Sequence, residues 1–158
     1  MVFLTSALCS KDDNINDVKS LTCDNLINDP IDGNDSFYIF IPNAFTPNKD
    51  GVDDRLYLFL KNIATLKMTI FDENSNIVFQ AENLNQQWDP NSSSVTEQTY
   101  YYRIEATSTT GKRIGMCGEV YPLSCVPKNS SDKYFFQNQF NGYFFDPSLS
   151  SGEDNICP

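Results

Sequence analysis

The sequence predicts an all-β protein, an antiparallel β-sandwich with irregular N- and C-terminal arms. Its 158 residues suffice for one domain with its own core, and 40% of them are hydrophobic despite a formal net charge of -10. From residue 36 onward, short apolar runs alternate with turn residues, as in sandwiches of the immunoglobulin-like type. Together these observations predict about six to seven strands.

We expect six of these strands at definite places along the chain. They span residues 36–42, 55–61, 65–71, 76–81, 98–107 and 112–123. The run RLYLFLK at 55–61 is apolar on both faces, which favours a central position in a sheet. In the run 65–71, Leu66, Met68 and Ile70 alternate with polar residues, so one face should be buried and the other should face solvent.

The aromatic residues near the later strands have two interpretations. Alternation in the run 98–107 places Tyr100 and Tyr102 inward and Tyr101 outward. Trp88, the only tryptophan, could line a carbohydrate-binding platform together with Tyr101. A single large aromatic residue in a sandwich more often packs in the core or at its edge, so packing is the favoured interpretation for Trp88.

The composition of the chain divides it into four segments. They are residues 1–9, 10–35, 36–123 and 124–158. The second segment is acidic and rich in Asn and Asp without a sustained period, which predicts a tether. The fourth contains an aromatic stretch from Tyr134 to Phe145, which we expect to pack on the sandwich or extend it rather than to bind a partner.

Residues 1–9 are apolar and end at Cys9. With Ser10-Lys11-Asp12-Asp13 after it, this cysteine resembles the acylated first residue of a mature bacterial surface lipoprotein. We therefore expect lipidation at Cys9 and an anchor in the outer membrane, with residues 1–9 as the remnant of a signal. No run of about 18 apolar residues predicts a transmembrane helix.

The remaining cysteines form an even set, which predicts two disulfides in an oxidising compartment. These four residues are Cys23, Cys117, Cys125 and Cys157. Three connectivities are compatible with four cysteines, and the spacing does not choose among them. Pairing Cys117 with Cys125 would close a short loop, and Cys157 could tether the tail.

The composition argues against several classes of function. Acidic residues number 21 against 11 basic ones, so nucleic acid is not an expected partner. The chain has no histidine, which removes the commonest general base, and the sequence carries no phosphate-binding glycine loop. We therefore predict that the protein is not an enzyme.

One loop in the sequence IPNAFTPNKDGVDD, residues 41–54, carries a candidate cation site. Four oxygen-bearing side chains surround Gly51, namely Asn48, Asp50, Asp53 and Asp54. Calcium prefers such oxygen ligands and is the one candidate cofactor. The favoured alternative is a plain turn, in which Gly51 has a positive φ and the Asn and Asp side chains cap backbone amides, because the full EF-hand pattern is absent.

Within this loop, residues 42–54 resemble the hallmark PNAFTPNGDGVND of the gliding motility-associated C-terminal domain, also called the type B sorting domain of the type IX secretion system. Lys49 replaces a Gly of that hallmark, and Asp53 replaces an Asn. The segments TIFDENSNIVF, WDPN and TYYYRIEA follow in the order that the family shows. The resemblance covers about residues 37–120 and implies a β-sandwich with a cell-surface context.

The resemblance leads to three functional hypotheses. The first is a non-catalytic surface lipoprotein, anchored in the outer membrane, that contacts an outer-membrane or secreted protein as an accessory or adhesin-like component. The second is a cargo or sorting domain of the type IX secretion system. The third is a carbohydrate-binding module. The first leads because family members normally stop at their final strand, whereas this chain continues through Cys125 and Cys157.

Overall fold

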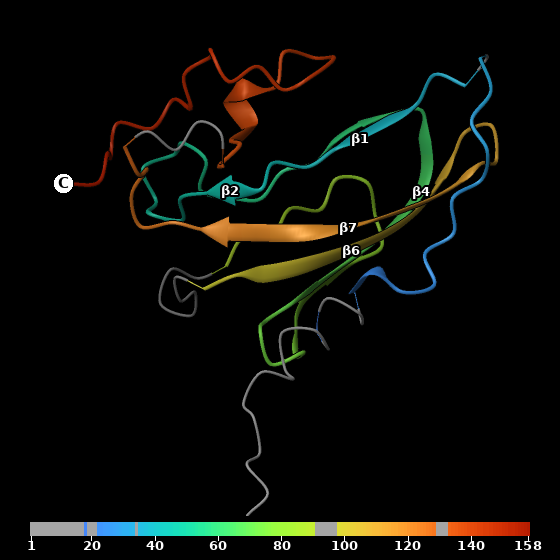
Figure 1. Ribbon diagram of the computed structural model, residues 1–158, viewed down its shortest axis with the longest axis horizontal. Helices are drawn as coiled ribbons and strands as arrows, with labels where there is room; N and C mark the ends of the chain where they lie inside the picture. Colours follow the sequence, from blue (N-terminus) through green and yellow to red (C-terminus); the bar gives the residue numbers. More distant parts are fainter. Residues whose placement is uncertain (1–17, 19–21, 34, 91–97, 129–132) are drawn as a thin grey trace, which may run out of the picture.

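The computed structural model describes residues 18, 22–33, 35–90, 98–128 and 133–158, and it confirms the all-β prediction (Figure 1). In this part of the chain seven strands form two sheets. A two-stranded sheet joins β1 (Tyr38–Phe40) to β3 (Phe59–Lys61), and a five-stranded sheet has the order β2-β7-β6-β4-β5. Its strands are β2 (Ala44–Phe45), β4 (Ile63–Phe71), β5 (Ile77–Ala81), β6 (Tyr100–Ser108) and β7 (Arg113–Pro122).

Two expectations about strand arrangement are wrong. The run 55–61 is not a central strand, because only Phe59–Lys61 is a strand and β3 has β1 as its one partner. The second apolar face of this run is covered by the C-terminal part of the chain instead of by a neighbouring strand. The sandwich is also not wholly antiparallel, since β2 pairs with the end of β7 in the parallel direction.

The core lies between the sheets and uses the alternation of β4 and β6. Leu66, Met68 and Ile70 are all buried, as predicted, and Met68 lies opposite Ile104 on β6. The opposite face of the sheet is not simply solvent-facing, because Tyr101 is 7% exposed and packs with Phe71 and Val18. The N-terminal part of the chain therefore covers some of this face.

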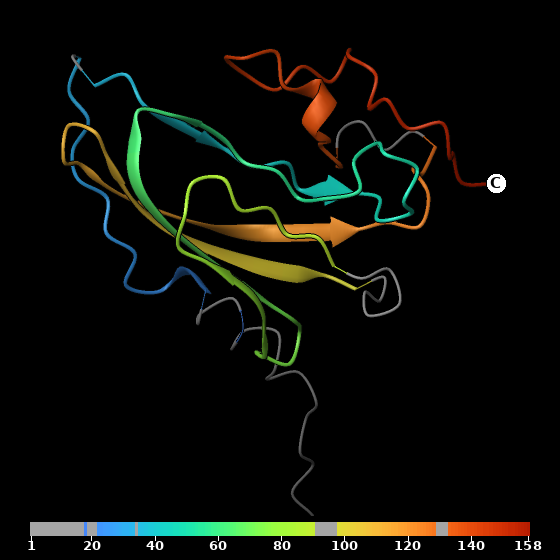
Figure 2. The same ribbon diagram turned by 180° about the vertical axis from the view of Figure 1, so that it is seen from behind.

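The N-terminal arm, which we define as residues 22–33, runs beside β7 (Figure 2). The amide of Asp29 donates to the carbonyl of Arg113 at 3.0 Å, and Asn28 exchanges two side-chain hydrogen bonds with the backbone of Gly115. A Cβ on Gly115 would lie 2.7 Å from the Cβ of Leu26, so only glycine lets the arm approach this closely. The described part of the predicted tether is therefore docked on the sheet.

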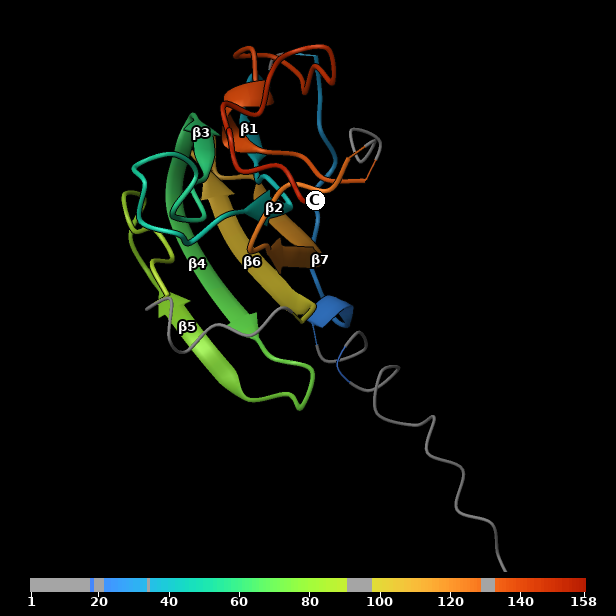
Figure 3. The same cartoon turned by 90° about the vertical axis from the view of Figure 1, so that its left-hand side faces the viewer.

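The C-terminal extension comprises residues 123–158, and its described part after residue 133 lies against β1 and β3 (Figure 3). It contains the 3₁₀ helix η1 (Gln137–Gln139), and Phe140 just after it stacks on Phe40 with ring centroids 4.4 Å apart. The ring of Phe59 lies 4.6 Å from the same Phe140 ring. The aromatic stretch thus packs on the two-stranded sheet, which places the extension next to the loop 46–54.

Candidate functional site

The loop between β2 and β3 begins with a tight turn, which we call the motif loop and define as residues 46–54. The amide of Thr46 donates to the carbonyl of Asp53 at 2.8 Å, which closes the turn. Three of its residues adopt left-handed backbone, with φ of 69° at Lys49, 95° at Gly51 and 47° at Asp53. Glycine and asparagine adopt this conformation with less strain than other residues, so Gly51 suits its position.

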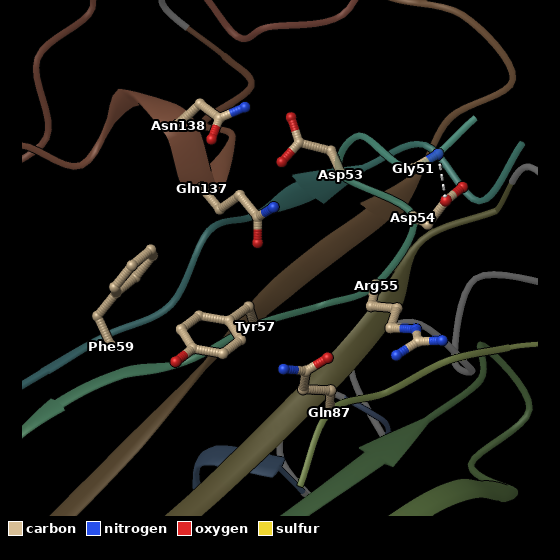
Figure 4. A pocket seen from close by; sticks show the side chains of 9 residues that line it. All are labelled: Gly51, Asp53, Asp54, Arg55, Tyr57, Phe59, Gln87, Gln137 and Asn138. Carbon is tan, nitrogen blue, oxygen red and sulfur yellow. Dashed lines mark hydrogen bonds between the residues drawn. The ribbon is translucent and has the colours of Figure 1, made fainter. Parts of the chain in front are cut away.

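The polar side chains of the motif loop mostly stabilise the turn. Asp54 accepts a hydrogen bond from the amide of Lys49 and another from the amide of Gly51, the second of which is drawn in Figure 4. Asp50 accepts from the amide of Val52 at 2.8 Å and from the side-chain amide of Asn48 at 2.8 Å. These contacts are the caps expected of a plain turn. Three of the four candidate calcium ligands, namely Asn48, Asp50 and Asp54, are held in this way.

Asp53, the fourth candidate, is different because its side chain turns inward. It is 2% exposed, and neither carboxylate oxygen accepts a hydrogen bond of regular geometry from the described residues. Burial and the nearby Glu153 carboxyl raise the pKa of Asp53 to about 7, while the Gln137 amide opposes this shift. Asp53 is therefore an acidic group in an environment that disfavours its charge.

Glu153, from the C-terminal extension, faces the same region. Its Oε1 accepts a hydrogen bond from the hydroxyl of Thr46, while its Oε2 is buried without a partner among the described residues. Burial raises its pKa as well, and the charges of Asp50 and Asp54 act in the same direction. The structure thus pairs the motif loop with an acidic residue that lies one hundred residues further along the chain.

A pocket of about 610 Å³ opens beside Asp53. Its walls come from the motif loop, the segment before β3, Phe59 of β3, Gln87 and η1. Figure 4 shows Asp53 directed toward the side where Gln137 and Asn138 lie, with Arg55 and Tyr57 across the opening. Arg55 pairs with Asp89 at 2.9 Å. The lining is mostly polar, so the pocket suits water, ions or small polar groups.

The proposed ligand platform does not form in this structure. Trp88 is 4% exposed and packs against Phe45 and Tyr100, at ring-centroid distances of 5.3 and 5.0 Å. Tyr101 lies on the other face of the sheet, under Val18. The expectation that Tyr101 points outward from the core is correct, but the N-terminal part of the chain covers it. Both rings are almost fully buried, and they lie on opposite faces of the sheet.

One disulfide fastens the N-terminal arm to the sandwich, and the other ties the end of the extension to its beginning. Cys23 of the N-terminal arm is bonded to Cys117 of β7, and Cys125 is bonded to Cys157. The short loop between Cys117 and Cys125 is therefore not closed by a disulfide. Cys9, the candidate lipidation site, lies outside the described residues.

Two other kinds of site are absent from the described ranges. No three side chains of the Asp, Glu, His and Cys types gather there in an arrangement suited to a metal. Within those same ranges, no helix has the length and apolar character needed to cross a membrane.

The fold and the motif loop define a small, disulfide-fastened β-sandwich of the kind expected outside the cytosol. The model of the CHU_C type IX secretion signal domain matches residues 39–120, and the chain belongs to this family. The match runs from β1 almost to the end of β7 and includes the motif loop. It confirms the resemblance drawn from the sequence. No curated protein and no solved structure gives a significant match.

Three of the site residues that sequence reasoning missed come from outside the matched region. Glu153, Gln137 and Asn138 approach the motif loop only because the extension folds back over β1 and β3. In the sequence, Glu153 is one acidic residue among 21 acidic residues, so its spacing carries no signal. The aromatic stretch before it was the available hint that the extension packs on the domain.

Proposed function

We propose that residues 39–120 act as a type IX sorting domain that directs this chain out of the cell. The main support is the family match. It favours the second hypothesis, a type IX cargo or sorting domain, over the first, an adhesin-like surface lipoprotein. A type IX secretion signal belongs to proteins that are secreted or held at the cell surface. A non-catalytic role agrees with the lack of histidine and with a secretion signal domain. The lipid anchor at Cys9 stays a prediction, since the match does not reach it.

We propose that the type IX apparatus recognises the side of the domain that carries β5, which lies within the matched region. The extension covers β1 and β3, and the N-terminal arm covers part of the edge of β7. No described residue pairs with the outer edge of β5, where Ile77 is 58% and Val78 is 42% exposed. An uncovered strand edge with apolar side chains is a suitable surface for another chain.

A reporter fusion tests this function. The fusion carries a signal peptide for the inner membrane, an enzymatic reporter and residues 10–158, so that Cys23 keeps its partner and Cys9 is left out. We expect the reporter in the medium or on the surface of cells that have the type IX apparatus, and in the periplasm of cells that lack its outer-membrane channel. Equal export from both strains would contradict the sorting role.

Two surface variants of the same fusion test the recognition face. Replacing Ile77 and Val78 together by Lys should lower export several-fold, since both side chains are exposed and their loss does not remove core packing. Ile31→Lys is the matched control, because Ile31 is an apolar residue 68% exposed on the N-terminal arm, outside the family match. Reduced export of the control alone would place recognition on the arm.

A further inference from the structure

The contact between the motif loop and the C-terminal extension contains buried acidic groups that the sorting role does not explain. Asp53 and Glu153 are 2% and 5% exposed, and three of their four carboxylate oxygens accept no hydrogen bond of regular geometry from the described residues, although the Gln137 amide lies near Asp53. Buried charges in proteins are normally paired or bound to a metal, because leaving them unpaired is costly. These two residues therefore call for a partner that carries positive charge.

No basic side chain in the described ranges provides that charge. The ion pairs there include none with Asp53 or Glu153, and Arg55, which lines the same pocket, pairs with Asp89. The carboxylates of Asp50 and Asp54 lie close enough to repel both buried groups. The environment thus concentrates negative charge at one place where the two segments meet.

We propose that Asp53 and Glu153 bind a calcium ion between the motif loop and the C-terminal extension. The buried oxygens Oδ1 and Oδ2 of Asp53 and Oε2 of Glu153 are the anionic ligands. The hydroxyl oxygen of Thr46, which already contacts Glu153, and water complete the shell. Calcium accepts such a mixture of charged and neutral oxygens in irregular geometry, whereas magnesium requires a near-ideal octahedron.

The site differs from a calcium site made by the motif loop alone. Asp50 and Asp54 cap backbone amides in the turn, so they contribute negative charge around the ion without being its ligands. Glu153 lies outside the residues that the family model matches, so the site joins the family domain to a segment that is particular to this chain. Calcium would hold the extension on the domain. The site rests on these contacts and not on the sorting role.

Calcium titration of the purified chain tests the proposal. After treatment with EDTA, addition of about 10 mM calcium chloride at pH 8 should raise the melting temperature by about 5 °C, given an affinity in the range of extracellular calcium modules. Calorimetry should give a stoichiometry of one. Glu153→Gln and Asp53→Asn should each abolish the shift. Magnesium chloride at the same concentration should give a smaller one.

Matched variants identify the ligands. Asp50→Asn keeps an amide-capping oxygen in the turn and should keep the calcium response, as should Asp146→Asn, an acidic residue of the extension away from the site. Asp53→Asn fits the left-handed backbone and removes a buried charge, so it should fold at least as well as the native chain in EDTA.

Three results would overturn the proposal. The first is a native chain that calcium does not stabilise but that lowering the pH does, because protons then neutralise the pair. The second is a Glu153→Gln variant that keeps the full calcium response. The third is loss of the response in Asp50→Asn alone, which would place the ion in the turn. A chain that binds calcium but is not exported would contradict the proposed sorting role and leave the calcium site in place.

Discussion

At the scale of single residues, the motif loop shows what the two departures from the family hallmark do. Lys49 stands where the hallmark has Gly, and Asp53 stands where it has Asn. Both have positive φ, of 69° and 47°. Gly and Asn tolerate left-handed backbone best, so the hallmark residues match the conformation that the turn requires. This chain keeps the conformation with less suitable residues because the Asp54 caps and the closing Thr46–Asp53 bond hold it.

Restoring the hallmark glycine should therefore stabilise the protein. Lys49→Gly removes left-handed strain at an exposed position, and we expect the free energy of unfolding to rise by about 0.5–1 kcal/mol. Urea denaturation measures this change. Lys61→Gly is the control, because Lys61 lies in β3 with ordinary extended backbone and its replacement should destabilise by a similar amount. A loss of stability in Lys49→Gly would mean that the lysine side chain makes a contact of its own.

At the scale of elements, the N-terminal arm shows how a polar segment becomes part of a sheet protein. The guanidinium of Arg113 donates to both carboxylate oxygens of Asp29, at 2.7 and 3.0 Å, and the backbone amide of Arg113 donates to one of them. These hydrogen bonds from Arg113 lower the pKa of Asp29 from 3.8 to about 2. The arm is therefore held by an ionised carboxylate as well as by the Cys23–Cys117 bond.

The docking of the arm should weaken in acid. Because the pKa of Asp29 is lower in the folded protein than in the unfolded chain, its contribution is complete above about pH 4 and is lost as the pH falls toward 2. The NMR resonance of the Arg113 amide should titrate with a midpoint near 2 in the native chain. That titration should be absent in Asp29→Asn. A midpoint near 4 in the native chain would show that the pair does not form in solution.

At the scale of the whole molecule, the extension behaves as a layer of the domain. Asn43, just before β2, exchanges hydrogen bonds with the backbone of Phe135, and Val126 pairs with Ile156 beside the Cys125–Cys157 bond. Phe140 covers β1 and β3 from the same side. The extension is therefore joined to the sheets at two separate places, beside β2 and over β1 and β3, and the matched region is only part of the folded unit.

Removing the second disulfide should loosen this layer without unfolding the sandwich. The bond spans 32 positions of sequence, and its loss in Cys125→Ser with Cys157→Ser should lower the free energy of unfolding by about 2–4 kcal/mol. Limited proteolysis should then cut the extension first and leave the N-terminal arm and the sheet intact. Unchanged cleavage rates would mean that the aromatic and backbone contacts alone hold the extension.

How much of this structure could be predicted depended on how local each signal is. The strands of the five-stranded sheet were predicted to within a few residues, except β2, because alternation along 63–71 and 100–108 is a local property. The turn in the motif loop was likewise expected from Gly51 and its capping side chains. The prediction of a central strand over 55–61 was wrong because the second apolar face of this run is covered by a segment about eighty residues away.

The amino-acid sequence by itself determined the all-β class, the family and the turn of the motif loop, since alternation, glycine position and motif order are all readable along the chain. Only the tertiary structure decided that Tyr101 is covered, that Cys23 pairs with Cys117, and that Asp53 meets Glu153. These three outcomes depend on where the two ends of the chain dock. Docking is set by packing between segments far apart in sequence, which no local pattern records.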